Sequence, residues 1–230
     1  MCIRDRKTES EAMAPLWWHS ERMDDADFWN ERYERTAPAD RSWTEVWPVA
    51  TLASLDALGC MPDDSLIDVG GGSGLLVDAL IEREWRDLCV LDLAGTALSQ
   101  ARARLGVRGD EVSWRTGDVR TVDLARTFTV WHDRAVLHFL TAPQDIAQYF
   151  AQLDRTVAPG GAAVIEVFGP TGPTQCSGLD VRQWATEDLI AAFGPAWETV
   201  RATTVDHVTP SGAVQAFSTV ALRRIIRENA

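Results

Sequence analysis

Residues 68–74, Asp-Val-Gly-Gly-Gly-Ser-Gly, form the stretch of this chain best suited to binding a ligand. The apolar pair Leu66 and Ile67 precedes it and the apolar run 75–77 follows it, which predicts a buried strand, a tight turn and the start of a helix. Glycines in such a turn let a ligand approach the backbone closely, near the amide-rich, positive end of the helix. We therefore expect a nucleotide-like cofactor to bind at this turn.

The spacing of the glycines excludes two common nucleotide-binding motifs. A dinucleotide-binding turn has glycines at relative positions one, three and six, with Gly or Ala at the sixth. Here the sixth position is Leu75 when counted from Gly70 and Val77 when counted from Gly72. A phosphate-binding P-loop would continue into Gly-Lys-Ser or Gly-Lys-Thr, and this stretch does not. The pattern that remains is an acid two residues ahead of three alternating glycines.

That pattern, Asp68-x-Gly70-x-Gly72-x-Gly74, resembles motif I of the class I S-adenosylmethionine (SAM) dependent methyltransferases. SAM is a nucleoside with an amino-acid tail and no phosphate, which agrees with the absence of Lys, Arg and Thr from the loop. The resemblance implies that SAM is the cofactor and that Asp68 and the three glycines contact it. The alternative interpretation is a glycine turn without a ligand.

A second acid stands where a βαβ unit binds the ribose of a nucleotide. Asp92 ends the predicted strand 89–91 and lies 22 residues beyond Gly70. At that place two carboxylate oxygens can accept hydrogen bonds from both ribose hydroxyls. We expect Asp92 and the adjacent Leu93 to contact the cofactor, although an ordinary aspartate at a strand end would look the same.

A third acid follows the predicted strand 112–114. The family that the chain resembles has an acid after its third strand that accepts a hydrogen bond from the adenine amino group, which implies this role for Asp118 and ring packing for Val119. Aspartate in a Gly-Asp turn is also common for turn reasons alone. Trp131, at the end of the fourth predicted strand, completes the expected cofactor contacts.

His132 is the candidate catalytic residue. It follows the predicted strand 128–131, and open α/β sheets present the carboxyl ends of their strands to the ligand. His132 is expected either to act as a general base near neutral pH or to be a hydrogen-bonded wall residue, and Asp133 is expected beside the substrate. Because adjacent side chains point in different directions and no third ligand is suitably spaced, a metal site is not expected.

The sequence His132-Asp133 also departs from one known pattern of the resembled family. An Asn-Pro-Pro-Tyr type sequence at this place orients the acceptor nitrogen in adenine-N6 and glutamine-amide methylation, and the chain lacks it. These two acceptors are therefore not expected.

Aromatic residues ahead of the glycine turn are candidates for a lid over the pocket. Trp29, Tyr33 and Trp43 have the arrangement seen in the N-terminal segment of a subset of small methyltransferases, although they could simply cover the edge of the sheet. Cys176 lies in the loop 169–178, and a loop of this length commonly lines a substrate pocket.

The domain boundaries follow from these motifs. We expect a loosely ordered arm over residues 1–24, a helical lid segment over 25–62, a SAM-binding domain over 63–225 and a tail over 226–230. The first six residues, MCIRDR, resemble a string from adaptor read-through in assembled environmental sequences and carry no fold argument.

The fold expected from the resemblance is an α/β/α sandwich. A strongly amphipathic helix beginning at Pro143, then Pro159-Gly160-Gly161 and the strand 163–168, resembles the entry into the fifth strand of the same family. The resemblance implies a seven-stranded, mostly parallel sheet of order 3-2-1-4-5-7-6 with an antiparallel last strand.

Composition limits the kinds of partner. The 230 residues carry a net charge of −12, which argues against nucleic acid as a partner. The four cysteines form no C-x-x-C pair, and no apolar run reaches 18 residues, so we expect neither disulfides nor a membrane span but a cytoplasmic protein. We expect a monomer or a homodimer.

Three functions are compatible with the sequence. The first is a methyltransferase acting on the S, O or N nucleophile of a small molecule by in-line transfer from SAM. The second is a protein lysine methyltransferase, because some of these share the compact fold and an aromatic N-terminal segment. The third is a SAM-binding module without turnover.

Overall fold

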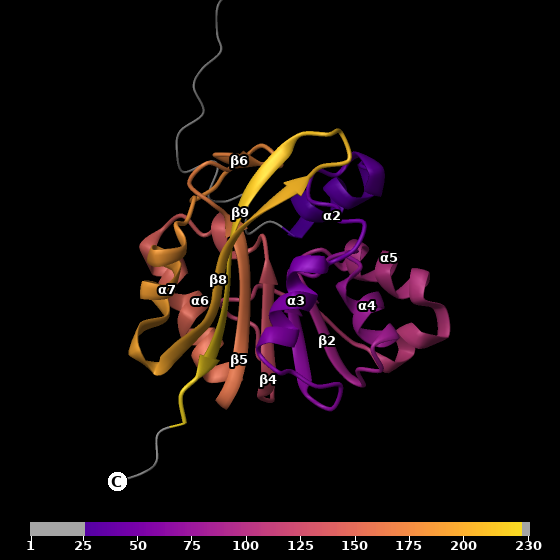
Figure 1. Ribbon diagram of the computed structural model, residues 1–230. Coiled ribbons are helices and arrows are strands. Elements are labelled where there is room, and N and C mark those ends of the chain that lie inside the picture. Colours follow the sequence, from indigo (N-terminus) through magenta and orange to yellow (C-terminus); the bar gives the residue numbers. More distant parts are fainter. Residues whose placement is uncertain (1–25, 227–230) are drawn as a thin grey trace, which may run out of the picture.

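The computed structural model describes residues 26–226, and the expected arm 1–24 lies outside this range. A central sheet runs through the molecule, with α3, α4 and α5 over one face and α6 and α7 over the other (Figure 1). The helices are α2 (Ala26–Arg35), α3 (Val49–Ala57), α4 (Leu76–Glu82), α5 (Gly95–Leu105), α6 (Pro143–Thr156) and α7 (Thr186–Phe193). The strands are β1 (Ser65–Val69), β2 (Asp87–Asp92), β3 (Ser113–Thr116), β4 (Phe128–Arg134), β5 (Val157–Phe168), β6 (Gln175–Cys176), β7 (Leu179–Asp180), β8 (Trp197–Val208) and β9 (Val214–Arg224).

The sheet has the order β3-β2-β1-β4-β5-β9-β8, with β6 and β7 forming a separate small hairpin. Neighbours from β3 to β5 are parallel, whereas β9 is antiparallel to both β5 and β8. If the seven strands of this sheet are numbered along the chain, the order is 3-2-1-4-5-7-6, and the expected fold is confirmed. The order reverses between β1 and β4, and the carboxyl ends of strands at such a switch point border the ligand crevice of open α/β sheets.

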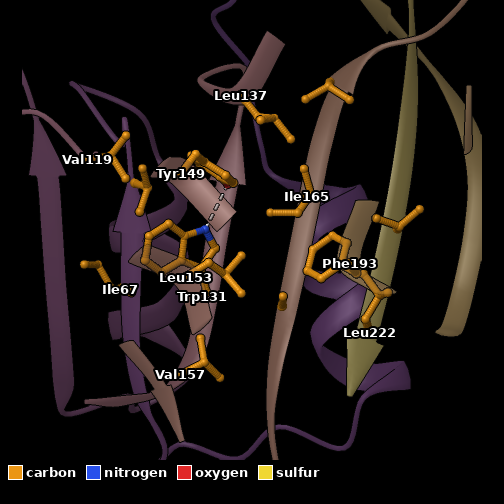
Figure 2. Packing of buried hydrophobic residues seen from close by; sticks show 14 of the residues in the cluster. Ile67, Val119, Trp131, Leu137, Tyr149, Leu153, Val157, Ile165, Phe193 and Leu222 are labelled. Atoms are coloured by element: carbon orange, nitrogen blue, oxygen red, sulfur yellow. Dashed lines mark hydrogen bonds between the residues drawn. The ribbon is translucent and has the colours of Figure 1, made fainter. Parts of the chain in front are cut away.

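Alternation along the strands separates two cores. Ile67 and Trp131 point toward α6 and α7, whereas Leu66 and Val130, one residue earlier in the same strands, point toward α3, α4 and α5. Figure 2 shows the first core, to which Trp131, Leu153 and Phe193 belong. Because the period of a strand is two, Asp68 and His132 face the α3 side of the sheet.

Three local differences from the sequence-based expectation concern the strand ends. The strand β4 continues to Arg134, because Asp133 and Arg134 pair with Ile165 and Glu166 of β5, so His132 lies within the strand and not after it. The strand β5 begins at Val157 and includes the Pro-Gly-Gly sequence expected to precede it. The loop after β5 contains the hairpin of β6 and β7.

The segment before β1 packs over the carboxyl end of the sheet. In α2, the Asn30 side chain accepts a hydrogen bond of 2.9 Å from the backbone N–H of Thr96 at the start of α5. Arg41 joins this segment to the glycine turn by donating to Ser73 Oγ at 2.8 Å and to the Tyr33 carbonyl at 2.9 Å. Among residues 26–226, no helix has the length and apolar character needed to cross a membrane.

Candidate functional site

A cavity of about 320 Å³ lies between the glycine turn, the end of β4 and the segment before β1. Most of the residues singled out from the sequence line it. These are Trp29, Tyr33, Trp43, Asp68, Gly70, Gly74, Asp92, Leu93, Asp118, Val119, His132 and Cys176. The residues that do not line it are Gly72, Trp131 and Asp133.

The glycine turn leaves no room for side chains. Gly70 and Gly72 have φ angles of +66° and +53°, a region that L-residues with a Cβ rarely adopt. A Cβ on Gly72 would overlap the Tyr33 hydroxyl, and one on Gly70 would overlap Val136. The turn is held against β2 by the Gly70 N–H, which donates to the Leu91 carbonyl at 2.7 Å. The backbone is therefore open to close contact with whatever fills the cavity.

Asp92 is set at the carboxyl end of β2, in the cavity wall. Its Oδ1 accepts a hydrogen bond of 2.8 Å from the Ala94 N–H. Burial raises the pKa of Asp92 to about 6, against the opposing effect of backbone N–H donors. The carboxylate is thus ionised at neutral pH but poorly solvated, and hydroxyl donors from a ligand would stabilise it.

Asp118 is paired with a neighbour that the sequence interpretation did not include. Arg120 Nε lies 3.0 Å from both carboxylate oxygens of Asp118, and Arg120 Nη1 lies 2.8 Å from Asp145 in α6. Burial opposes ionisation, but the hydrogen bonds and charge of Arg120 lower the pKa of Asp118 below its ordinary value. The Asp118 side chain is held at the cavity edge by three N–H donors of Arg120.

His132 belongs to a buried hydrogen-bond chain that crosses the α3 face of the sheet. Its Nδ1 lies 2.7 Å from Asp68 Oδ1, and its Nε2 lies 3.2 Å from Thr51 Oγ1 in α3. The Thr51 hydroxyl donates to Glu166 Oε1 in β5 at 2.6 Å. All four residues are at most 5% exposed.

The directions of these bonds determine the protonation state of His132. The Thr51 hydroxyl has a single proton, which goes to Glu166, so Nε2 must donate to it. An ionised Asp68 only accepts, so Nδ1 must also donate. Burial alone would lower the pKa of His132, but the charge of Asp68, its hydrogen bond, and the charges of Glu166 and Asp133 raise it above the ordinary value. With both carboxylates ionised, His132 is an imidazolium with no lone pair to offer.

Trp131 and Asp133 face the opposite side of the sheet and require a correction. Trp131 is completely buried, and its Nε1 donates to the Tyr149 hydroxyl at 3.0 Å (Figure 2), so the expected contact of its side chain with a cofactor is not supported. Asp133, also completely buried, accepts from that hydroxyl at 2.6 Å and from the N–H groups of Val136 and Leu137. It shapes the turn after β4 and does not reach the substrate side of the cavity.

Four aromatic side chains line one part of the cavity. The Tyr33 and Trp43 rings meet edge to face with their centroids 6.0 Å apart, and the Trp29 and Phe139 rings do so at 5.2 Å. Phe139 follows β4 and also lines the cavity. The three aromatic residues expected to form a lid therefore line the cavity together with Phe139.

Two charged residues at the end of the cavity were not identified from the sequence. Arg134, the last residue of β4, donates to the Trp43 carbonyl at 3.0 Å, and its Nε lies 3.3 Å from Glu45 Oε2 and 3.8 Å from Glu166 Oε2. Glu45 belongs to the short loop before α3, and a single charged residue in a loop forms no recognisable sequence motif. Only the folded chain brings it to the end of β4.

Within the described residues, no cluster of three or more His, Cys, Asp or Glu side chains is arranged to hold a metal ion. The Cys176 thiol lines the cavity, and burial raises its pKa above the ordinary value, so it is a neutral wall residue.

Comparison with known families gives one match to the chain. Residues 66–161, from β1 into β5, match the model of a family described as "Methyltransferase domain". No curated protein matches the chain.

Solved structures resemble the fold over most of its length. The 1,6-didemethyltoxoflavin-N1-methyltransferase of Burkholderia thailandensis, which contains S-adenosylhomocysteine (SAH), has 19% sequence identity and a TM-score of 0.64, with 95% of this chain and 94% of that chain covered. The N-methyltransferase NodS of Bradyrhizobium japonicum WM9, also in complex with SAH, has 18% identity and a TM-score of 0.64 over 87% and 99% of the two chains. A SAM-dependent methyltransferase of Mesorhizobium loti has 16% identity and a TM-score of 0.59 over 75% and 96%. At these identities the likeness supports the shared fold.

Proposed function

We propose that the chain, which its methyltransferase domain and fold assign to the class I SAM-dependent methyltransferases, methylates a small molecule. The observation that carries the proposal is the convergence of the glycine turn, Asp92 and Asp118 on the wall of one cavity. These groups follow β1, β2 and β3. The folded chain therefore brings the glycine turn and the two downstream acids, Asp92 and Asp118, to one surface.

The residues present fit SAM. A Cβ at Gly70 or Gly72 would overlap neighbouring side chains. Because glycine has no Cβ, the backbone of the turn can itself contact the amino-acid tail of SAM. Asp92 is a buried, ionised acceptor suited to the ribose hydroxyls, Leu93 packs beside it, and Asp118 with Val119 suits the adenine ring. Asp68 anchors the turn from below, where the His132 imidazolium holds its carboxylate.

The catalytic contribution of the chain is mainly alignment. When bound, SAM would supply a sulfonium methyl group for in-line transfer to a nucleophile, with S-adenosylhomocysteine as the leaving group. The cavity walls hold the two reactants at contact distance, and such positioning can lower a barrier by roughly 7–11 kcal/mol in well-oriented systems. The aromatic lid of Trp29, Tyr33 and Trp43 excludes water from the nucleophile and from the cofactor. We assign His132 to the structure of the site and not to proton transfer, because both of its ring nitrogens donate.

The acceptor is proposed to be a small molecule because aromatic side chains wall a cavity of limited size. Tyr33 lies against Gly72 of the turn, its ring meets that of Trp43, and the cavity that they line has a volume of about 320 Å³. The fold neighbour from Burkholderia thailandensis binds 1,6-didemethyltoxoflavin, a small molecule, together with SAH. This likeness supports the same acceptor class for the present chain.

The test is methyl transfer from SAM labelled in the methyl group. We expect the purified protein to label small molecules of a metabolite extract that has been freed of protein, and we expect Asp92→Asn to reduce the labelling at limiting SAM. Label appearing only on proteins in a complete extract would contradict a small-molecule acceptor. Binding of SAM without labelling of either fraction would leave a SAM-binding module as the function.

A further inference from the structure

One part of the cavity lies at the carboxyl end of β4, beyond the residues assigned to the cofactor. We call this the acceptor chamber, and its walls are Trp29, Glu45, Arg134, Phe139 and Cys176. The cofactor groups Asp92 and Asp118 stand at the ends of β2 and β3, on the other side of β1 in the sheet. A molecule that reacts with the cofactor at the switch point therefore enters from this chamber.

Two arginines bring positive charge close to the acceptor chamber, because the charge of Arg32 acts on the Cys176 thiol and Arg134 lies beside Glu45. Arg134 is shared by Glu45 at 3.3 Å and Glu166 at 3.8 Å, so one guanidinium faces two carboxylates. The His132 imidazolium is matched by Asp68 at 2.7 Å.

The nearby His207 adds no charge. Burial lowers its pKa below the ordinary value, and one ring nitrogen is 2.7 Å from the Ser42 carbonyl. Glu45 is thus the acidic group on the wall of the acceptor chamber that a positively charged ligand would meet.

The remaining walls are those that suit an organic cation. The rings of Trp29 and Phe139 meet edge to face at 5.2 Å, and Cys176 packs in the same apolar cluster. Aromatic faces attract ammonium groups through their quadrupoles, and they do so more strongly in dry surroundings.

Glu45 is the proton acceptor best placed in this chamber. His132 has no free lone pair, Asp92 is bound by backbone donors, and Asp118 is held by Arg120. Within residues 26–226, the group paired with the Glu45 carboxylate is Arg134, which engages Oε2.

We propose that the acceptor is an amine, that its ammonium form binds between Glu45 and the aromatic walls, and that Glu45 removes its proton. This inference rests on the proposed function. The carboxylate takes one proton from R–NH₃⁺ and leaves R–NH₂ with a free lone pair. The nitrogen then forms the N–C bond while the S–C bond breaks, and the electron pair of that bond returns to sulfur. The positive charge thus passes from sulfur to nitrogen in the product R–NH₂⁺–CH₃.

The electrostatics of Glu45 agree with this role. Burial raises the pKa of Glu45 above its ordinary value, and Arg134 opposes the shift without cancelling it. A carboxylate with a raised pKa is a better base near neutral pH than an exposed one.

The experiment measures binding to the complete protein saturated with SAH. Three probes of one skeleton differ in charge: 2-phenylethylamine is cationic at pH 7, 2-phenylethanol is neutral and phenylacetate is anionic. Calorimetry should show that the amine binds at least tenfold more tightly than the alcohol and that phenylacetate binds most weakly.

Two variants locate the preference. Glu45→Gln should reduce the preference for the amine over the alcohol to less than threefold. Glu31→Gln is the control, because Glu31 also pairs with an arginine, Arg35, but lies on the exposed face of α2. This variant should leave the preference for the amine unchanged.

Each result decides between the proposals. Equal binding of amine and alcohol, or a preference that survives Glu45→Gln, overturns the amine acceptor and leaves the SAM assignment standing. Failure of SAH itself to bind overturns both. With labelled SAM, methyl transfer to 2-phenylethanethiol but not to 2-phenylethylamine would also overturn the inference.

Discussion

Replacing Thr51 by valine tests the buried chain that links the glycine turn to β5. Valine has nearly the shape of threonine, so Thr51→Val creates no cavity but removes the hydroxyl between His132 and Glu166. Thr51 is 1% exposed, so water does not replace the lost partner. A buried imidazolium N–H and a buried carboxylate oxygen each lose a hydrogen bond.

The expected cost follows from those two losses. Leaving a buried polar group without its partner costs about 1–3 kcal/mol, and more for a charged group. Glu166 keeps the attraction of Arg134 at 3.8 Å, which limits its share. We expect Thr51→Val to lower the free energy of unfolding by about 3 kcal/mol, and the Tm by roughly 6–12 °C for a chain of this size.

Urea unfolding followed by tryptophan fluorescence measures this change, with a thermal scan beside it. Thr199→Val is the matched control, because Thr199 is exposed on β8 and its substitution should change the free energy of unfolding by less than about 0.5 kcal/mol. If Thr51→Val changes the free energy of unfolding as little as this control does, the hydroxyl does not link a buried imidazolium to a buried carboxylate, and the protonation state derived for His132 is wrong.

Three further predictions concern the same site. The folded pKa of His132 is raised, so its stabilising contribution should be complete below the unfolded pKa of about 6.5 and lost as pH rises through the folded pKa; the wild-type advantage over His132→Gln in free energy of unfolding should therefore be larger at pH 6 than at pH 9, and a constant difference would contradict the imidazolium. Asp92 has a pKa of about 6, so the affinity for SAH should fall between pH 7 and pH 5 as this carboxylate becomes protonated, and Asp92→Asn should remove that dependence; a pH dependence that persists in the variant would assign it to another group. Gly72→Ala should weaken SAH binding because its Cβ displaces the Tyr33 hydroxyl, and Tyr33→Phe in the same chain should restore part of the affinity; no recovery would mean that the strain at φ +53° dominates.

The fold was predictable because its signals are local. The glycine turn, the acids at the ends of β2 and β3, and the helix α6 each depend on short stretches of sequence whose periodicity or spacing identifies them. The strand order came from the resemblance to a family, since parallel pairing depends on contacts between distant residues. The end of β4 was misplaced by three residues because the pairing of Arg134 with Glu166 extends the strand, and no local pattern announces that pairing.

The site was less predictable where a side chain's role depends on the face it occupies. Trp131 and Asp133 were expected to face the cofactor and the substrate, but both lie within β4 on the face opposite to His132, and the sequence-based strand ended too early to show this. Thr51, Glu45 and Arg134 were missed because they meet from α3, a short loop and β4. A lone threonine or glutamate has no sequence signature, whereas repeated glycines do.

Calorimetric titration of the purified protein with SAH tests the central claim most directly. The account predicts one binding site per chain and an affinity that Asp92→Asn lowers at least tenfold, because an ionised acceptor for the ribose hydroxyls is lost. Absence of binding, or equal affinity in the two proteins, would contradict the assignment of the cavity to SAM.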